Sequence, residues 1–150
     1  MPVPEPQDHL AICAVKARYF RLLDTKQWRD FRDLFTDDAE LDYPSLGQFA
    51  DVGEAVEALA HRLDGVTTVH HGHMPEIDLV DDETATGIFA MYDRVIPAPG
   101  QVLGGPPELQ HGRHGFGHYH DVFRRDGDGW RIARLSLTRL HREALTPQGG

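Results

Sequence analysis

The residues best suited to acid–base chemistry lie in the first half of the chain. Ten histidines occur in the sequence, and His70 belongs to a short run of them at residues 70–73. A histidine, with an ordinary pKa of about 6.5, can take and return a proton at neutral pH. Asp24 stands near the end of an apolar helical stripe, where an acid points to solvent, caps the next helix or pairs with a partner. A structural histidine with satisfied hydrogen bonds is the alternative for His70.

A second set of histidines has spacing that suits a metal ion. Alternate residues of a strand face opposite sides, so His71 and His73 share a face that His70 does not. His118 and His120 repeat the His-x-His spacing later in the chain, and two such pairs could bind zinc or nickel. Neither motif carries a cysteine or a convincing carboxylate. We therefore expect no metal, and burial in an oligomer interface explains these histidines equally well.

Strand parity also groups residues in the second half of the chain. Tyr119 and Asp121 fall on one face of their predicted strand, opposite His118 and His120. On the preceding strand, one face carries three candidate pocket residues, which are Phe89, Met91 and Asp93. A buried aspartate needs a partner. The candidate partners of the two aspartates are Arg94, Arg134 and Arg139.

The elements that must position these groups change type after Gly65. Apolar spacing predicts helices over 8–23, 28–35 and 52–63, with Asp8 as the first N-cap, and a short strand over 39–43. A period of two then predicts strands over 67–80, 84–96, 111–125 and 130–140. They are joined by turns at 81–83 and 126–129 and by a Gly/Pro-rich loop over 97–110. Helices first and strands last indicate an α+β fold, with helices packed on one face of a curved sheet that encloses a pocket.

Composition excludes several classes of protein. The 150 residues carry 24 acidic and 15 basic side chains, a net charge of −9 that disfavours nucleic acid as a partner. No apolar run approaches the ~18 residues that would suit a membrane span, and residues 1–8 do not read as a signal peptide. The single cysteine, Cys13, fits a reducing compartment, so we expect a cytoplasmic protein. We expect a flexible arm over 1–7, one domain over 8–142 and a tail over 143–150.

Several stretches resemble one known family. Residues 19–28 (Tyr-Phe-Arg-Leu-Leu-Asp-Thr-Lys-Gln-Trp) and 34–43 (Leu-Phe-Thr-Asp-Asp-Ala-Glu-Leu-Asp-Tyr) resemble the opening of the SnoaL-like, scytalone dehydratase-like branch of the nuclear transport factor 2-like superfamily. Residues 68–77, 117–123 and 129–132 fit the same family. The resemblance implies a cystatin-like cone, in which the N-terminal helices pack on the concave face of a curved antiparallel sheet.

The resemblance also implies roles for individual residues. Asp24 and His70 match an Asp-His pair of the dehydratase and dehydrochlorinase members, while Tyr43 and Tyr19 match family tyrosines. Leu23 stands where scytalone dehydratase-like enzymes have a tyrosine, so we expect a different substrate. The predicted catalytic residues are Asp24 and His70, and the predicted substrate-binding residues are Tyr19, Trp28, Tyr43, Phe89, Met91, Asp93, Tyr119 and Asp121.

These expectations lead to a cofactor-free lyase of dehydratase type. Its substrate would be a small hydrophobic molecule with a carbonyl beside the acidic C–H. A ketosteroid isomerase-like or polyketide cyclase-like enzyme is the nearest alternative, and a non-catalytic small-molecule-binding protein is the alternative from another class. The open sheet face needs a cover, so a homo-oligomer is expected, either dimer or trimer.

Overall fold

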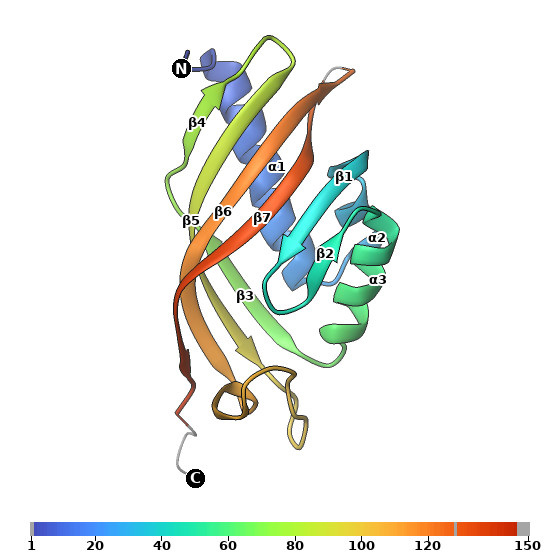
Figure 1. Ribbon diagram of the computed structural model, residues 1–150, viewed down its shortest axis with the longest axis vertical. Helices are drawn as coiled ribbons and strands as arrows, with labels where there is room; N and C mark the ends of the chain where they lie inside the picture. The colour runs from blue at the N-terminus through green and yellow to red at the C-terminus, as the bar shows by residue number, and fades with distance from the viewer. Residues whose placement is uncertain (1, 128, 147–150) are drawn as a thin grey trace.

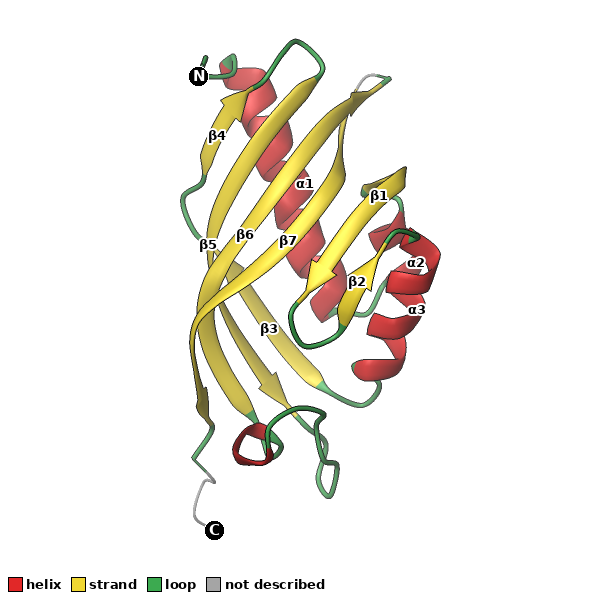
Figure 2. Ribbon diagram, in the orientation of Figure 1, coloured by secondary structure: helices red, strands yellow, loops and turns green. Residues whose placement is uncertain are grey.

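A computed structural model describes residues 2–127 and 129–146. In that part of the chain, three α-helices pack against a curved seven-stranded sheet, which confirms the predicted α+β class (Figure 1). The helices lie on the concave side of the sheet, and the long strands curve alongside them (Figure 2). None of the described helices is both long and apolar enough to cross a bilayer.

The first and third helices match their predicted bounds to within two residues, whereas the second ends three residues early and residue 35 already belongs to a strand. They are α1 (Pro6–Asp24), α2 (Trp28–Arg32) and α3 (Val52–Arg62). The prediction that Asp8 caps α1 is wrong, because the helix starts at Pro6, and proline suits the first turn since it has no N–H to leave unpaired. The Asp8 carboxylate instead accepts a hydrogen bond from Trp130 Nε1 at 2.9 Å. In α3, Asp51 is the cap and accepts from the Glu54 amide at 2.9 Å.

The sheet is mixed, whereas the resemblance implied an antiparallel one. Its strands are β1 (Phe35–Tyr43), β2 (Gly47–Phe49), β3 (Thr67–Gly72), β4 (Glu76–Leu79), β5 (Thr84–Ile96), β6 (Arg113–Asp126) and β7 (Gly129–Ala144). Their order is β2-β1-β7-β6-β5-β3, with β4 also paired to β5. The β1–β7 pair is parallel and the others are antiparallel. A short 3₁₀ helix (Pro107–Leu109) lies in the loop between β5 and β6.

The main difference from the predicted strands falls in residues 67–80. This stretch is two strands, because Pro75 cannot donate to a ladder and the chain leaves β5 between Gly72 and Glu76. Gly72 also lets α1 approach closely, since a Cβ there would lie 2.3 Å from the Phe20 ring. The strand β7 continues to Ala144, past the predicted end at 140. The predicted turn at 126–129 includes residue 128, which lies outside the described residues.

The core lies between the helices and the concave face of the sheet. Buried residues of α1, such as Ile12, Tyr19 and Leu23, belong to the same apolar cluster as residues of every described strand except β2 and β3. The predicted parity of β5 and β6 is confirmed, because alternate residues are buried along both strands. Residues from this inward face therefore provide the walls of any site between sheet and helices.

Candidate active site

An aspartate and a histidine meet where α1 ends beside β3. Asp24 is the last residue of α1 and accepts three hydrogen bonds from β3. The His70 amide donates to Oδ2 at 2.8 Å, the Thr68 hydroxyl donates to Oδ1 at 2.9 Å, and His70 Nδ1 lies 2.7 Å from Oδ1. The side chains of His70 and Asp24 are 9% and 21% exposed. Backbone and side chain together therefore fix the carboxylate against one edge of the ring.

The other ring nitrogen of His70 faces a second carboxylate. Asp93 lies directly across from His70 in the β3–β5 ladder, and its Oδ2 is 3.9 Å from His70 Nε2. Asp93 is held by Arg139, whose Nη1 and Nη2 donate to the two carboxylate oxygens at 2.6 and 2.7 Å. A separation of 3.9 Å is too long for a hydrogen bond. Nε2 is thus left as a free acceptor when Nδ1 carries the proton toward Asp24.

Arg139 is the partner of Asp93 among the three arginines considered from the sequence. It reaches across β6 because residue 115, the cross-strand neighbour of Asp93, is a glycine. A Cβ at Gly115 would lie 3.3 Å from Arg139 Nη1. The fork-shaped pairing satisfies both oxygens of a nearly buried carboxylate and balances its charge beside His70.

Three tyrosines form a buried cluster close to His70, and two of them line a cavity with it. The hydroxyls of Tyr19 and Tyr43 lie 2.7 Å apart, and the rings of Tyr19 and Tyr119 pack edge to face with centroids 5.4 Å apart. Burial raises the pKa of all three phenols well above the ordinary value near 10. They therefore stay protonated and able to donate hydrogen bonds across the physiological pH range.

These groups surround a small cavity of about 80 Å³. Its polar wall includes four predicted site residues, which are Tyr43, His70, Asp93 and Tyr119, together with Arg139. Its apolar wall comes from Leu23, Leu46, Leu59, Leu63, Val95 and Leu137. The cavity brings together a proton acceptor and hydroxyl donors in a wall that is partly apolar and partly charged. A base and hydrogen-bond donors to the developing oxyanion are the groups that proton transfer at carbon requires.

The remaining predicted site residues do not line this cavity. The Tyr19 hydroxyl is hydrogen-bonded to that of Tyr43, and the partly buried Trp28 packs edge to face on Phe31 at the margin of the core. Met91 is buried with its sulfur 3.9 Å from Arg139 Nη1, and Phe89 packs against Phe123. Asp121 is fully buried and forms an ion pair of 2.7 Å with Lys16. Phe89, Met91 and Asp121 share the predicted inward face of β5 and β6, but they are buried away from the cavity. Tyr19 and Trp28 come from α1 and α2 and not from the sheet.

Lys16 is a residue of this region that the sequence reasoning missed. Its ammonium lies over the rings of Tyr119 and Tyr19, at 3.7 and 4.1 Å from their centroids. The signal was available, because Lys16 is four residues from both Ile12 and Phe20 on the buried stripe of α1. Burial lowers the pKa of the Lys16 ammonium and raises that of the Asp121 carboxyl.

The four histidines considered as metal ligands do not converge on one point. His71 lies near Tyr92, whereas His73 follows the end of β3 and lines a separate hollow against α1 with Lys16. Strand parity therefore does not extend to His73. His120 Nε2 lies 3.1 Å from the Thr138 hydroxyl. Within residues 2–127 and 129–146, no three histidine, cysteine or acidic side chains are grouped as metal ligands.

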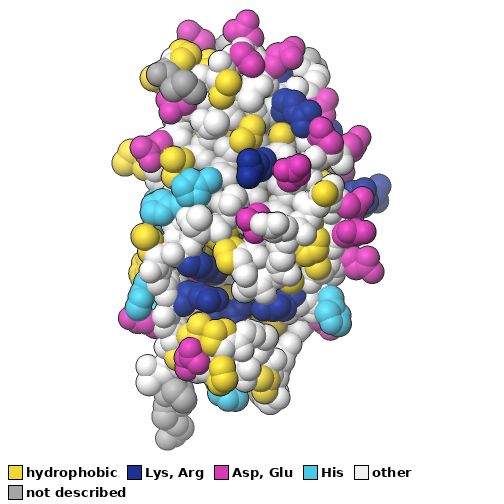
Figure 3. All heavy atoms as spheres, in the orientation of Figure 1, with side chains coloured by type: hydrophobic (Ala, Val, Ile, Leu, Met, Phe, Trp, Pro, Cys, Tyr) yellow, Lys and Arg dark blue, Asp and Glu magenta, His cyan; other side chains and the backbone are white. Residues whose placement is uncertain are grey.

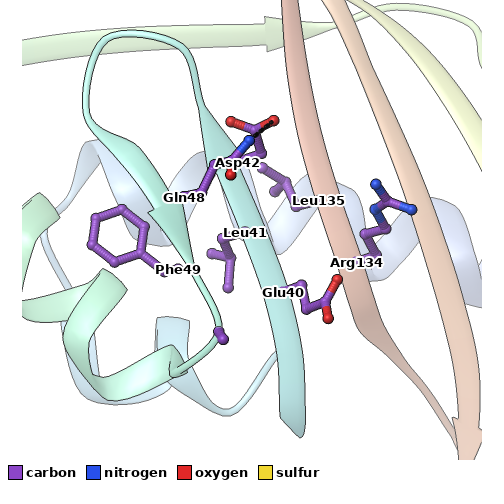
Figure 4. A pocket seen from close by; sticks show the side chains of 8 residues that line it. Glu40, Leu41, Asp42, Gln48, Phe49, Arg134 and Leu135 are labelled. Carbon is purple, nitrogen blue, oxygen red and sulfur yellow. Dashed lines mark hydrogen bonds between the residues drawn. The ribbon is translucent and has the colours of Figure 1, made fainter.

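A wider hollow of about 340 Å³ lies elsewhere, against β1, β2 and β7 (Figure 4). Its rim carries Glu40, Asp42, Gln48 and Arg134, and Gln48 donates to Asp42 at 3.4 Å. None of the predicted site residues lines it. The smaller cavity is the candidate active site because it alone of the two contains a histidine with an oriented ring.

Comparisons with known proteins agree with this architecture. A family model described as a SnoaL-like domain matches residues 4–136. A protein from Kribbella flavida is similar in fold, with a TM-score of 0.79, 22% identity, and coverage of 91% of this chain and 93% of that one. A Novosphingobium aromaticivorans protein provisionally assigned as a scytalone dehydratase has a TM-score of 0.74, 17% identity, and coverage of 93% and 89%. A type 2 hexachlorocyclohexane dehydrochlorinase has a TM-score of 0.79, 17% identity, and coverage of 96% and 95%.

Proposed function

The chain belongs to the SnoaL-like domain family, and we propose that it is a cofactor-free lyase that eliminates water or a similar group from a small carbonyl compound. The observation that carries the proposal is the oriented ring of His70, with Asp24 on Nδ1 at 2.7 Å and Nε2 free toward the cavity. The similarity in fold to proteins assigned as a dehydratase and a dehydrochlorinase is consistent with an elimination.

The proposed reaction begins with proton removal from the carbon beside the carbonyl. His70 Nε2 takes the proton, and the C–H electrons form an enolate whose charge collects on the carbonyl oxygen. Asp24 stabilises the resulting imidazolium through the Nδ1 contact. The Tyr43 and Tyr119 hydroxyls, which line the same cavity, supply hydrogen bonds to that oxygen, while Arg139 stays in its pair with Asp93.

The second step expels the leaving group. The enolate electrons re-form the carbonyl and create a carbon–carbon double bond as the neighbouring C–O bond breaks. His70 returns its proton to the departing oxygen, so that water leaves and the histidine is neutral again. One base thus serves as acid in the second step, and no external oxidant or reductant is consumed.

The test follows proton exchange at carbon in heavy water. We would incubate cyclic ketones and β-hydroxy ketones with the wild type, with His70→Ala and with Asp24→Asn, and record deuterium uptake and water loss by mass spectrometry. Wild-type exchange that falls at least a hundredfold in both folded variants is the expected result. His111→Ala, an exposed histidine outside the cavity lining, is the matched control and should exchange at the wild-type rate.

The product mass separates elimination from isomerisation. Loss of 18 mass units identifies a dehydratase, whereas exchange with no change in atoms identifies an isomerase-like proton shuttle. Undiminished exchange in folded His70→Ala would exclude the mechanism. If no carbonyl compound exchanges while small molecules still bind, the protein is a binding protein and the lyase proposal fails.

A further inference from the structure

The cavity that holds His70 has a second, strongly basic end. Three arginines line the cavity, which are Arg62, Arg113 and Arg139. Of the three, Arg139 alone has a carboxylate partner among residues 2–127 and 129–146, in the Asp93 pair described above. Within the described residues, no carboxylate lies within 4.0 Å of the guanidinium nitrogens of Arg62 or Arg113. In a chain with 24 acidic residues and a net charge of −9, two such cations in one cavity need an explanation.

Arg113 is the more unusual of the two. The Arg113 residue is only 8% exposed, and the one hydrogen bond that its side chain makes to a described residue is donated by Nη1 to the Gly104 carbonyl at 3.0 Å. Burial and the charges of Arg62, Arg142 and Arg139 lower the pKa of Arg113, while Asp93, already paired with Arg139, raises it. A guanidinium has five N–H donors, and none of the other Arg113 nitrogens is buried without a partner, so they remain accessible from the cavity. A nearly buried cation without a counter-charge is costly unless an anion completes it.

The loop between β5 and β6 brings Arg62 and Arg113 together. Gly104 accepts the Arg113 hydrogen bond, and the guanidinium of Arg62, at the C-terminal end of α3, packs against the same glycine. A Cβ at Gly104 would lie only 2.9 Å from Arg62 Cζ. On the face drawn in Figure 3, a band of Lys and Arg side chains crosses the lower half, just above this loop.

The basic end is distinct from the reacting end. Arg113 pairs with Val95 across the β5–β6 ladder, and Val95 is two residues from Asp93, the residue opposite His70. Two residues of a strand span about 7 Å. A single small molecule can therefore reach from Arg113 to His70 along this wall.

From these observations we infer that the substrate is an anion, a carboxylate-bearing carbonyl compound whose acid group is bound by Arg113 and Arg62 while its reacting carbon lies against His70. This inference refines the expected small hydrophobic substrate and rests on the proposed function only for the position of the reacting carbon. Planar, fork-shaped recognition by guanidinium groups favours a carboxylate, and the small cavity favours one ring or a short chain.

The test measures binding, which needs no turnover. Benzoate and benzamide have nearly the same shape and differ in charge, so their dissociation constants can be compared by calorimetry at low salt. We expect benzoate to bind at least tenfold more tightly than benzamide, and added salt to weaken only benzoate. Arg113→Gln and Arg62→Gln should each abolish this preference. Arg134→Gln, which removes the same charge from the outer hollow, should keep it.

Each outcome decides the inference. Equal binding of the two probes, binding of neither, or a preference that survives in both arginine variants would overturn it. Arg62 is only half-buried, so Arg62→Gln remains informative if Arg113→Gln does not fold. Benzoate preference in His70→Ala, together with no exchange by the wild type, would retain the anion site and reject the lyase. Exchange by the wild type without any benzoate preference would retain the lyase proposal and reject the anion site.

Discussion

At the scale of single residues, the hydroxyls of Tyr43 and Tyr19 have unequal positions. Tyr43 lines the cavity, whereas Tyr19 contacts it only through the 2.7 Å hydrogen bond to Tyr43. Tyr43 is the group that can donate to a developing enolate, and Tyr19 can only orient it. This arrangement predicts coupled effects on the reaction.

Replacing Tyr43 by Phe should lower the exchange rate by about a hundredfold, since one donor to an oxyanion is worth roughly 3 kcal/mol. Replacing Tyr19 by Phe should cost about tenfold, because Tyr43 keeps its hydroxyl but loses its neighbour. The double variant should be no slower than Tyr43→Phe alone, since the two residues act as one unit. Additive losses, measured as exchange rates in heavy water on a ketone that the wild type exchanges, would contradict this.

The sequence predicted the centre of the candidate site better than its walls. Asp24 and His70 were paired through the family resemblance, and the structure brings them to 2.7 Å. The choice of Arg139 over Arg94 and Arg134 could not be made beforehand, because it depends on the missing side chain at Gly115. Arg62 and Arg113 were not considered, because their meeting depends on where an irregular loop places Gly104.

At the scale of secondary elements, α1 is joined to the sheet by charge as well as by apolar packing. Lys16 of α1 and Asp121 of β6 form a pair in which both side chains are at most 1% exposed. Asp8 at the start of α1 accepts hydrogen bonds from Arg125 and Trp130 at the far end of the sheet. Helix periodicity predicted that α1 packs on the sheet, but periodicity says nothing about which charged residue the interface tolerates.

The buried pair predicts non-additive changes in stability. Lys16→Met leaves the Asp121 carboxylate without a counter-charge and should lower the free energy of unfolding by about 3–5 kcal/mol. The double variant Lys16→Met/Asp121→Leu removes both charges and should recover most of that loss. Urea unfolding of the single and double variants gives the coupling energy.

The single variant should also lose stability as pH rises. Burial raises the pKa of Asp121 above its unfolded value even with Lys16 present, and removing Lys16 raises it further. A carboxyl with a raised folded pKa stabilises the protein below the unfolded pKa near 4, and that contribution is lost as pH rises. Lys16→Met should therefore unfold at lower urea at pH 8 than at pH 5. Equal midpoints, or no recovery in the double variant, would show that the pair is not buried as described.

At the scale of the whole molecule, the fold buries two polar groupings in its core, which are the tyrosine cluster and the Lys16–Asp121 pair. The fold itself was predictable, because the change of period after Gly65 separates helices from strands along the chain. The parallel pairing of β1 with β7 was not, since it joins strands far apart in sequence and no turn sets their register. The mixed sheet buries Tyr19, Tyr43 and Tyr119 together, so three of the four tyrosines depend on the intact fold.

This dependence gives a prediction for alkaline pH. A group whose folded pKa is raised contributes stability that is complete below its unfolded pKa, near 10 for tyrosine, and is lost as pH rises toward the folded value. In that interval each phenol lowers the free energy of unfolding by about 1.4 kcal/mol per pH unit, so the three together should lower it by about 4 kcal/mol per pH unit. Lys16, whose folded pKa is lowered, opposes this slope only below its unfolded pKa of about 10.4.

Two signals follow this loss from about pH 10.5 upward. The free energy of unfolding measured in urea should fall at about 4 kcal/mol per pH unit, and Tyr43→Phe should reduce that slope by about one third. Tyrosinate absorbance from three of the four tyrosines should appear only as the fold is lost. If those phenols ionised while the protein stayed folded, the cavity wall would be open to water, and the low-dielectric enclosure on which the proposed chemistry relies would be absent.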